Sequence, residues 1–208
     1  MTREERALEF MNIMEETYPD AECSLDTVNA LQLLISVQLA AQCTDARVNI
    51  VTKTLFPKYP DVHAFANADL EELEQDIKPT GFYHNKAKNI IGCCQRLIEV
   101  YGGEVPDTME DLLSLPGVGR KTANLILGDV FHKGGMVIDT HAKRLLKRVG
   151  LTTETDPTKV EFDVEGLFPK ERQSDFCHRL VLHGRAICDA RKPRCEVCPA
   201  APICMKKI

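Results

Sequence analysis

The sequence LPGVGRKTAN, residues 115–124, decides the fold. Helical patterns flank its turn at 107–113 and 120–131, so this part of the chain is predicted to form helix, tight turn, helix. Gly117 and Gly119 allow positive φ angles and a close backbone approach. The turn then exposes backbone N–H groups at a helix N-terminus, where the helix dipole favours an anion such as a phosphate group. An ordinary pair of helices joined by a short turn fits the same pattern.

The residues that follow the turn favour a functional site. Lys121 falls in the first turn of the second helix, where a positive charge opposes the helix dipole. Arg120 adds a like charge beside it, and both effects favour the neutral amine. We therefore expect a partly buried amine that is suited to Schiff-base chemistry, although a solvated surface lysine is the alternative.

Helical periodicity dominates the rest of the chain, and the sequence predicts an all-α fold. Segment 135–138 is too short to assign as helix or strand. The further expected helices cover residues 3–18, 29–42, 46–55, 69–77, 85–101 and 140–149, one that starts at 156–157, and 171–188.

Composition bounds the class of protein. The 208 residues are 44% hydrophobic, enough for one large domain or two small ones. No apolar run reaches the roughly 18 residues of a membrane helix, and the charged N-terminus is unlike an export signal. We expect a cytoplasmic protein with no membrane partner. The net charge is −5, but residues 77–208 hold 21 basic and 16 acidic side chains, against five and 15 in residues 1–76.

Four of the nine cysteines crowd into the last 21 residues. Cys188, Cys195, Cys198 and Cys204 have the spacing Cys-x6-Cys-x2-Cys-x5-Cys. Zinc usually takes two paired Cys-x2-Cys knuckles, whereas this single pair with two lone cysteines suits a larger centre such as a four-iron cluster. The loop 189–194 between the first two cysteines carries three cations. For the other five cysteines, core packing is the default.

Residues 115–124, followed by Val137-Ile138-Asp139-Thr140-His141, resemble the helix-hairpin-helix glycosylase superfamily, specifically the endonuclease III family. The resemblance runs from 34–49 to the final cysteines. It implies a bifunctional DNA glycosylase and abasic-site (AP) lyase of base excision repair that removes oxidised pyrimidines from double-stranded DNA. Lys121 would attack the sugar C1′ with help from Asp139, and β-elimination from the Schiff base would nick the strand. Relatives that excise adenine opposite oxidised guanine lack this lysine.

The resemblance also implies a [4Fe–4S] cluster on the four cysteines, a monomer, and a set of DNA contacts. Gln42 matches the glutamine that the family inserts opposite the flipped base, and Phe82 stands where the family's wedge is often leucine. The chain also lacks the tryptophan that members often carry shortly before position 178. The other expected contacts are Leu115, Gly117, Val118, Gly119 and Arg120 of the hairpin and Arg191, Lys192 and Arg194 of the loop.

Three acidic or titratable residues admit two interpretations each. Asp139 and Asp45 are either helix N-caps or active-site carboxylates, and for Asp139 both can hold together. His141 is either a site residue or a histidine that satisfies a structural hydrogen bond.

We expect two helical domains that flank a cleft: residues 22–132 with the hairpin, and residues 1–21 plus 133–208 with the cluster loop. Lys121 and Asp139 should face each other across the cleft mouth. Three alternatives stay open: a monofunctional mismatch glycosylase, a non-enzymatic DNA-binding or redox-sensing protein, and a zinc-stabilised helical protein unrelated to DNA.

Overall fold

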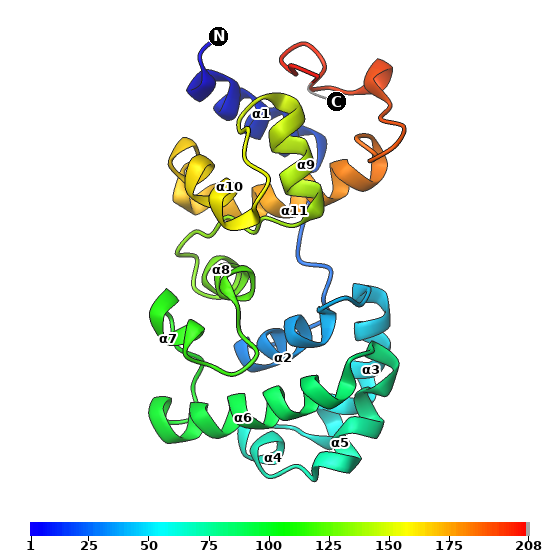
Figure 1. Ribbon diagram of the computed structural model, residues 1–208, viewed down its shortest axis with the longest axis vertical. Helices are drawn as coiled ribbons and strands as arrows, with labels where there is room; N and C mark the ends of the chain where they lie inside the picture. Colours follow the sequence, from blue (N-terminus) through cyan, green and yellow to red (C-terminus); the bar gives the residue numbers. More distant parts are fainter. Residues whose placement is uncertain (207–208) are drawn as a thin grey trace. The chain divides into compact units, whose positions relative to one another are not determined.

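The protein is all-helical, as the periodicity predicts. The computed structural model describes residues 1–206, which form α-helices and short 3-10 helices without a strand (Figure 1). Segment 135–138 is therefore not a strand. No helix within residues 1–206 is long and apolar enough to cross a membrane. The chain divides into two compact units: a central unit, Ser24–Phe131, and a terminal unit that combines Met1–Cys23 with the chain from His132 onward.

The central unit is built around its longest helix, α6. The shorter helices α4 and α5 pack on α6, while α2 contacts α3 and α8, and α7 contacts α8 (Figure 1). The buried side chains of Leu34, Leu39, Ile90 and Leu97 contribute to its core. The helices of this unit are α2 (Ala30–Ala40), α3 (Asp45–Lys58), α4 (Val62–Ala66), α5 (Leu70–Ile77), α6 (Tyr83–Tyr101), α7 (Met109–Leu113) and α8 (Arg120–Asp129).

The turn between α7 and α8 packs through its apolar residues, in part on α6. Leu115 and Val118 are buried, and Pro116 lies over Gly92 of α6, where an added Cβ would meet the proline ring at 3.5 Å. The Val118 N–H closes the turn on the Leu115 carbonyl at 3.1 Å. The apolar residues of the turn thus fix its position on α6, which leaves its glycines at the surface.

Several helix boundaries differ from the predicted ones for local reasons. Helix α2 ends at Ala40, two residues early, because Gln42 adopts a left-handed conformation. Helix α6 begins at Tyr83 rather than 85, directly after Phe82, which is also left-handed. Helix α3 continues to Lys58. Helix α4 is not among the predicted helices, because its five residues are too few to show a period.

The terminal unit brings the two ends of the chain together. Helix α11 packs on α1 and α9, around a core that includes Phe10, Met14, Leu146 and Phe176. Its helices are α1 (Arg3–Thr17), α9 (Thr140–Val149), α10 (Pro157–Val164) and α11 (Gln173–Ala186). Cys177 is buried here, as Cys93 and Cys94 are in the central unit, whereas Cys23 and Cys43 are half-buried.

The last long helix is shorter than predicted. Residues Lys170–Arg172 form a 3-10 turn before α11, and α11 ends at Ala186. Cys188 therefore lies beyond the helix, in the loop that carries the other three C-terminal cysteines.

Candidate functional site

The hairpin needs its first glycine for two reasons. Gly117 has φ of +76°, and a Cβ there would lie 2.7 Å from Oε1 of Gln38 and 2.8 Å from Cβ of Asn89. Gly119 has an ordinary φ of −100° and open space above it. No side chain caps α8, in contrast to α7, where the Thr108 hydroxyl accepts a hydrogen bond from the Asp111 N–H. The N-terminus of α8 is thus left for an external acceptor. Because the side chains of Leu115 and Val118 are buried, their contact with such an acceptor is limited to the backbone.

Lys121 is the second residue of α8 and its side chain is exposed. The prediction that its amine is partly buried is therefore wrong. The neighbouring Arg120 is half-buried, so the two cations of the first turn differ in their access to solvent. An exposed lysine on a rigid helix can reach a bound molecule, with the hairpin directly before it.

Asp139 caps α9 in the terminal unit. Its Oδ1 accepts a hydrogen bond from the Ala142 N–H at 2.7 Å, and the residue is half-buried. The N-cap prediction is confirmed. The bond fixes the direction of the carboxylate and leaves Oδ2 outside it, so capping and a chemical role are compatible.

His141 is packed between α9 and α11. Its Nδ1 accepts a hydrogen bond from the Arg144 guanidinium at 3.1 Å, and Gly184 of α11 is so close that a Cβ there would lie 2.5 Å from the ring. Burial, followed by the nearby arginines, lowers the pKa of His141, although the Asp139 carboxylate opposes this shift. These contacts match the structural interpretation of this histidine.

Asp45 does not cap its helix. The N-cap of α3 is Thr44, whose hydroxyl accepts from the Arg47 N–H at 3.3 Å. Asp45 stands in the first turn, where a negative charge complements the helix dipole, and accepts a short hydrogen bond from the Ser24 hydroxyl. The carboxylate thus ties the start of the central unit to α3.

A pocket in the central unit brings Gln42 and Phe82 together beside the hairpin. Both residues line it together with Gly117 and Thr122. Both are left-handed, with φ of +56° and +48°, a conformation that costs non-glycine residues of order 1–3 kcal/mol and clusters at functional sites. Phe82 is 63% exposed and is therefore not a core aromatic. Backbone strain and an exposed apolar side chain therefore occur together at this pocket.

Two further residues of this pocket were not predicted from the sequence. Lys86 and Gln38 both line it although each side chain is buried. Lys86 donates to the carbonyls of Leu39 and Thr80. A sequence signal did exist for Lys86, because it stands four residues before the buried Ile90 on the apolar face of α6.

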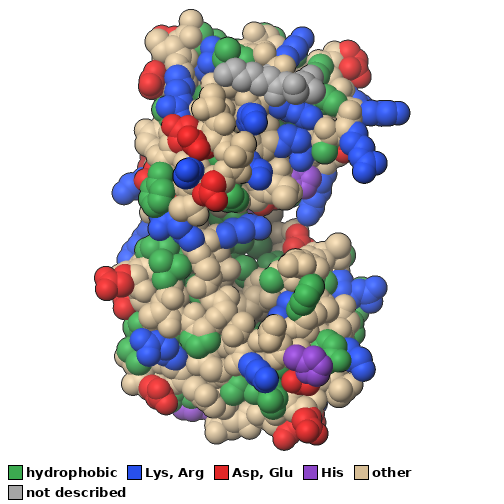
Figure 2. Space-filling view, viewed as in Figure 1, with side chains coloured by type: hydrophobic (Ala, Val, Ile, Leu, Met, Phe, Trp, Pro, Cys, Tyr) green, Lys and Arg blue, Asp and Glu red, His purple; other side chains and the backbone are tan. Residues whose placement is uncertain are grey.

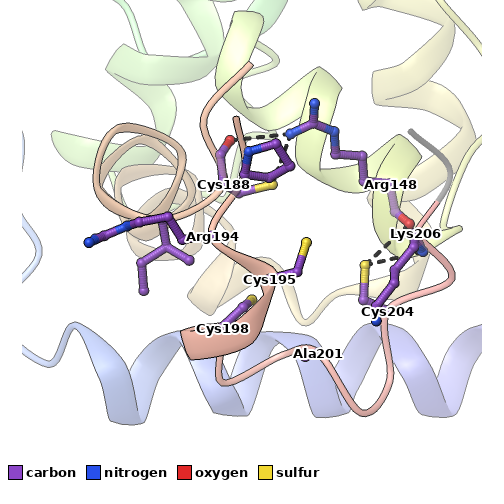
Figure 3. A pocket seen from close by; sticks show the side chains of 10 residues that line it. Arg148, Cys188, Arg194, Cys195, Cys198, Ala201, Cys204 and Lys206 are labelled. Carbon is purple, nitrogen blue, oxygen red and sulfur yellow. Dashed lines mark hydrogen bonds between the residues drawn. The ribbon is translucent and has the colours of Figure 1, made fainter. Parts of the chain in front are cut away.

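The four C-terminal cysteines surround one pocket, with their sulfurs drawn around the same space (Figure 3). A single zinc ion at about 2.3 Å from each sulfur would bring tetrahedral ligands within about 4 Å of one another. No three of these four sulfurs, all in the described part of the chain, lie within 4.8 Å of one another. The donor set therefore fits a larger, polynuclear centre better than one zinc ion. Burial raises the pKa of Cys198 and Cys204, so their thiolates need a cationic neighbour.

Hydrogen-bond donors point at these sulfurs. The buried Arg148 donates to Sγ of Cys188 at 3.3 Å (Figure 3). It also donates to the carbonyls of Asp189 and Ala190. The Nε2 atom of His183 lies 3.4 Å from Sγ of Cys198. Such donors orient thiolate ligands and tune the centre that they hold.

The cationic loop is held by its own acidic residue. The Asp189 carboxylate accepts from the backbone N–H groups of Arg191 and Lys192 at 2.8 and 3.0 Å, and the side chains of both residues are exposed. Arg194 differs, because its guanidinium donates to the Ala186 carbonyl at 2.6 Å. Figure 2 shows many Lys and Arg side chains on the visible face of the terminal unit.

The chain is similar to known base excision repair proteins. Residues 35–170 match the family described as HhH-GPD superfamily base excision DNA repair protein. The chain is 48% identical to endonuclease III of Synechocystis sp., over 98% of this chain and 93% of that protein. It is 46% identical to endonuclease III of Bacillus subtilis, over 91% and 87%. A solved structure of a trapped covalent intermediate of endonuclease III with DNA superimposes with a TM-score of 0.92 at 42% identity, over 99% of this chain and 97% of that one.

Proposed function

This chain belongs to the endonuclease III family of HhH-GPD base excision DNA repair proteins, and from that membership we propose that it is a bifunctional DNA glycosylase and AP lyase. Its substrates are double-stranded DNA with an oxidised or ring-saturated pyrimidine, and abasic sites. The observation that carries the proposal is Lys121, an exposed amine in the first turn of an uncapped helix directly after the hairpin. The relative that was trapped in a covalent complex with DNA supports a covalent route.

Lys121 acts as the nucleophile. Its neutral amine attacks C1′ of the damaged nucleotide, the glycosidic bond breaks, and the base leaves with the bonding electron pair. The sugar ring opens to the Schiff base, the C2′ proton is removed, and the bond from C3′ to its phosphate oxygen breaks, which nicks the strand. Asp139 stabilises positive charge that develops on the sugar and accepts a proton from the Lys121 ammonium. Its cap bond to Ala142 holds it in a fixed direction for this work. Asp45 and His141 support the site through their contacts with Ser24 and with α11.

DNA is held by backbone and side chains of both units. The hairpin and the start of α8 bind a phosphate through N–H groups, with Gly117 and Gly119 keeping side chains out of the way. Extrusion of the damaged nucleotide leaves a gap in the stack. Gln42 fills that gap and Phe82 acts as the wedge, which agrees with their common pocket and with the exposure of Phe82.

The cysteines Cys188, Cys195, Cys198 and Cys204 hold a [4Fe–4S] cluster, which their spacing in the sequence and their position around one pocket support. When bound, the cluster supplies a rigid cross-link among four points of the C-terminal loop. Arg148 supports the same loop through the carbonyls of Asp189 and Ala190. Arg191 and Lys192 are thereby presented to DNA phosphates. We further propose that the protein acts as a monomer in the cytoplasm, associated with the nucleoid.

The proposed function is tested on three duplexes that carry a ring-saturated thymine, an abasic site, or no lesion. We expect strand nicking without alkali and borohydride-trapped adducts on the first two duplexes, and neither product on the third. Base release that yields a nick only after alkali would indicate a monofunctional glycosylase. Binding without either product would indicate a non-enzymatic DNA-binding protein.

Metal analysis tests the cluster. Anaerobically purified protein should be yellow-brown and contain iron and sulfide in equal amounts, because four thiolates with this spacing suit a [4Fe–4S] centre. Removal of the iron with a chelator should lower the melting temperature, since the C-terminal loop loses its cross-link. Zinc without iron or sulfide in the anaerobic protein would contradict the cluster assignment.

Salt dependence tests the cationic loop. Replacement of Arg191 or Lys192 by Ala should weaken binding to all DNA sequences alike and reduce the slope of log K against log salt by up to about 0.9 for each lost phosphate contact. Arg194→Ala should change the slope less, because this guanidinium already donates to Ala186. An unchanged slope in the Arg191 and Lys192 variants would remove the loop from the interface.

A further inference from the structure

Lys86 is a buried lysine that joins two segments of the central unit. Its side chain leaves the apolar face of α6, and its Nζ donates to the Leu39 carbonyl at 2.7 Å and to the Thr80 carbonyl at 2.8 Å. Leu39 belongs to the last turn of α2, and Thr80 ends the 3-10 helix Lys78–Thr80. The carbonyls at the end of a helix lack partners within it, and a positive charge there complements the dipole. One ammonium thus satisfies two helix ends.

Each of these segments leads directly into a left-handed residue. Gln42 follows Leu39 by three positions, and Phe82 follows Thr80 by two. A left-handed non-glycine residue persists only where the surrounding structure over-determines its conformation. The backbone N–H of residue 86 also donates to the Phe82 carbonyl at 3.1 Å, but this is the first i to i−4 bond of α6 and does not depend on the lysine side chain. The Lys86 side chain is therefore bound to both of the segments that lead into the strained residues.

Removing a charged ammonium from water costs free energy, and a structural contact alone does not require a charged group. The side chain is 6% exposed, and burial lowers the pKa of its ammonium. Both hydrogen bonds of its ammonium go to backbone carbonyls rather than to a carboxylate. An ammonium has three N–H donors, of which the carbonyls use two, and Lys86 lines the same pocket as Gln42 and Phe82.

Gln38 adds a second polar group to that pocket. It is 5% exposed, and neither its amide nitrogen nor its amide oxygen has a hydrogen-bond partner of ordinary geometry. Burial raises the pKa of the neighbouring Cys93 thiol to about 11, and the Gln38 amide opposes this rise. The pocket is thus lined by buried polar groups whose hydrogen bonds are not all made. Buried polar groups are usually hydrogen-bonded, so this arrangement is unusual for a purely structural region.

We propose that Lys86 is a positioning residue for nucleotide extrusion, which holds Gln42 and Phe82 in place through the Leu39 and Thr80 carbonyls. The proposal rests on the proposed function, because it assigns Lys86 to the step in which the damaged nucleotide leaves the stack. Its consequence is selective. Loss of Lys86 impairs excision where a nucleotide must be forced out of a paired duplex, and spares excision where the nucleotide is already unstacked.

The test compares Lys86→Met, which keeps the length of the side chain without its N–H groups, with Lys88→Met, an exposed lysine of the same helix. Single-turnover excision of a ring-saturated thymine is measured in a fully paired duplex and in an unpaired bulge, below the melting temperature of every variant. Lys86→Met should slow excision from the paired duplex by about tenfold or more, as expected when two buried carbonyls lose their partner. Excision from the bulge should change by less than about twofold, as should both rates of Lys88→Met.

Two further measurements separate positioning from damage to the fold. Fluorescence of 2-aminopurine beside the lesion, which reports unstacking, should rise less with Lys86→Met than with the unaltered protein. Lys86→Arg retains charged N–H donors and should restore part of the fluorescence and of the rate. In a double-mutant cycle with Gln42→Ala, the losses should be less than additive, because both residues act on one step.

Equal losses on the paired and bulged substrates, or unchanged fluorescence, would overturn the positioning role. Failure of the proposed function has a different signature, namely no borohydride adduct of the unaltered protein on abasic DNA. The fluorescence comparison remains decisive for Lys86 in that case, because it reports extrusion without excision.

Discussion

Lys121→Gln should abolish the borohydride-trapped enzyme–DNA adduct. A glutamine amide is similar in reach to the lysine side chain but cannot form a Schiff base. Base excision should fall by at least about a thousandfold, the scale seen when a covalent nucleophile is removed. The side chain is exposed, so the substitution leaves the core of the central unit intact. The adduct is measured by denaturing electrophoresis of labelled abasic duplex after borohydride treatment.

A matched substitution controls for the loss of a positive charge. Lys53→Gln removes an exposed lysine from α3 of the same unit and should trap DNA as the unaltered protein does. Lys121→Gln should still bind lesion DNA, since the backbone of the hairpin and the cationic loop are unchanged. A trapped adduct of normal yield in Lys121→Gln would mean that another amine is the nucleophile.

The sequence predicts the features of this protein that depend on local pattern. Helix type follows from periodicity, and the start of α9 follows from Asp139, whose side chain bonds to the Ala142 N–H. The need for glycine at position 117 follows from the tight turn and is seen in its φ of +76°. The four C-terminal cysteines gather as their spacing indicates. Each of these features is fixed by residues that lie close together in the sequence, the widest set running from Cys188 to Cys204.

The features that the sequence did not predict depend on contacts between distant segments. The apolar run of α2 gives no sign that the chain turns left-handed at Gln42. The end of α2 is bound instead by Lys86 of α6, which donates to the Leu39 carbonyl from 47 positions along the chain. The exposure of Lys121 likewise depends on how α8 packs, not on its own neighbours in sequence. The sequence does carry one sign of this contact, because Lys86 falls on the same apolar face of α6 as Ile90.

The pairing of Lys121 with Asp139 across a cleft stays a prediction, as do the two domains proposed to flank that cleft. Lys121 belongs to the central unit and Asp139 to the terminal unit, so the pairing is a matter for kinetics. The terminal unit contains a matched pair of aspartates with which this prediction can be tested. Asp139 is bound as an N-cap through one oxygen, and Asp156 of the same unit caps α10 in the same way, through the Lys159 N–H at 3.0 Å. The two carboxylates share a structural task, so a difference between their variants reports chemistry.

Asp139→Asn should lower base excision by about a hundredfold or more, while Asp156→Asn leaves it unchanged. Asparagine is as good an N-cap as aspartate, so both variants should melt within a few degrees of the unaltered protein. The Asp139 variant loses the negative charge that stabilises the developing sugar cation and accepts a proton from the Lys121 ammonium, effects worth about 10²–10⁴-fold each. Trapping on a pre-formed abasic site should fall less than excision, because the base has already left and only the amine must attack. The two rates are measured by single-turnover kinetics on lesion and abasic duplexes. If Asp139→Asn excises bases at the rate of Asp156→Asn, Asp139 is a helix cap without a part in the reaction.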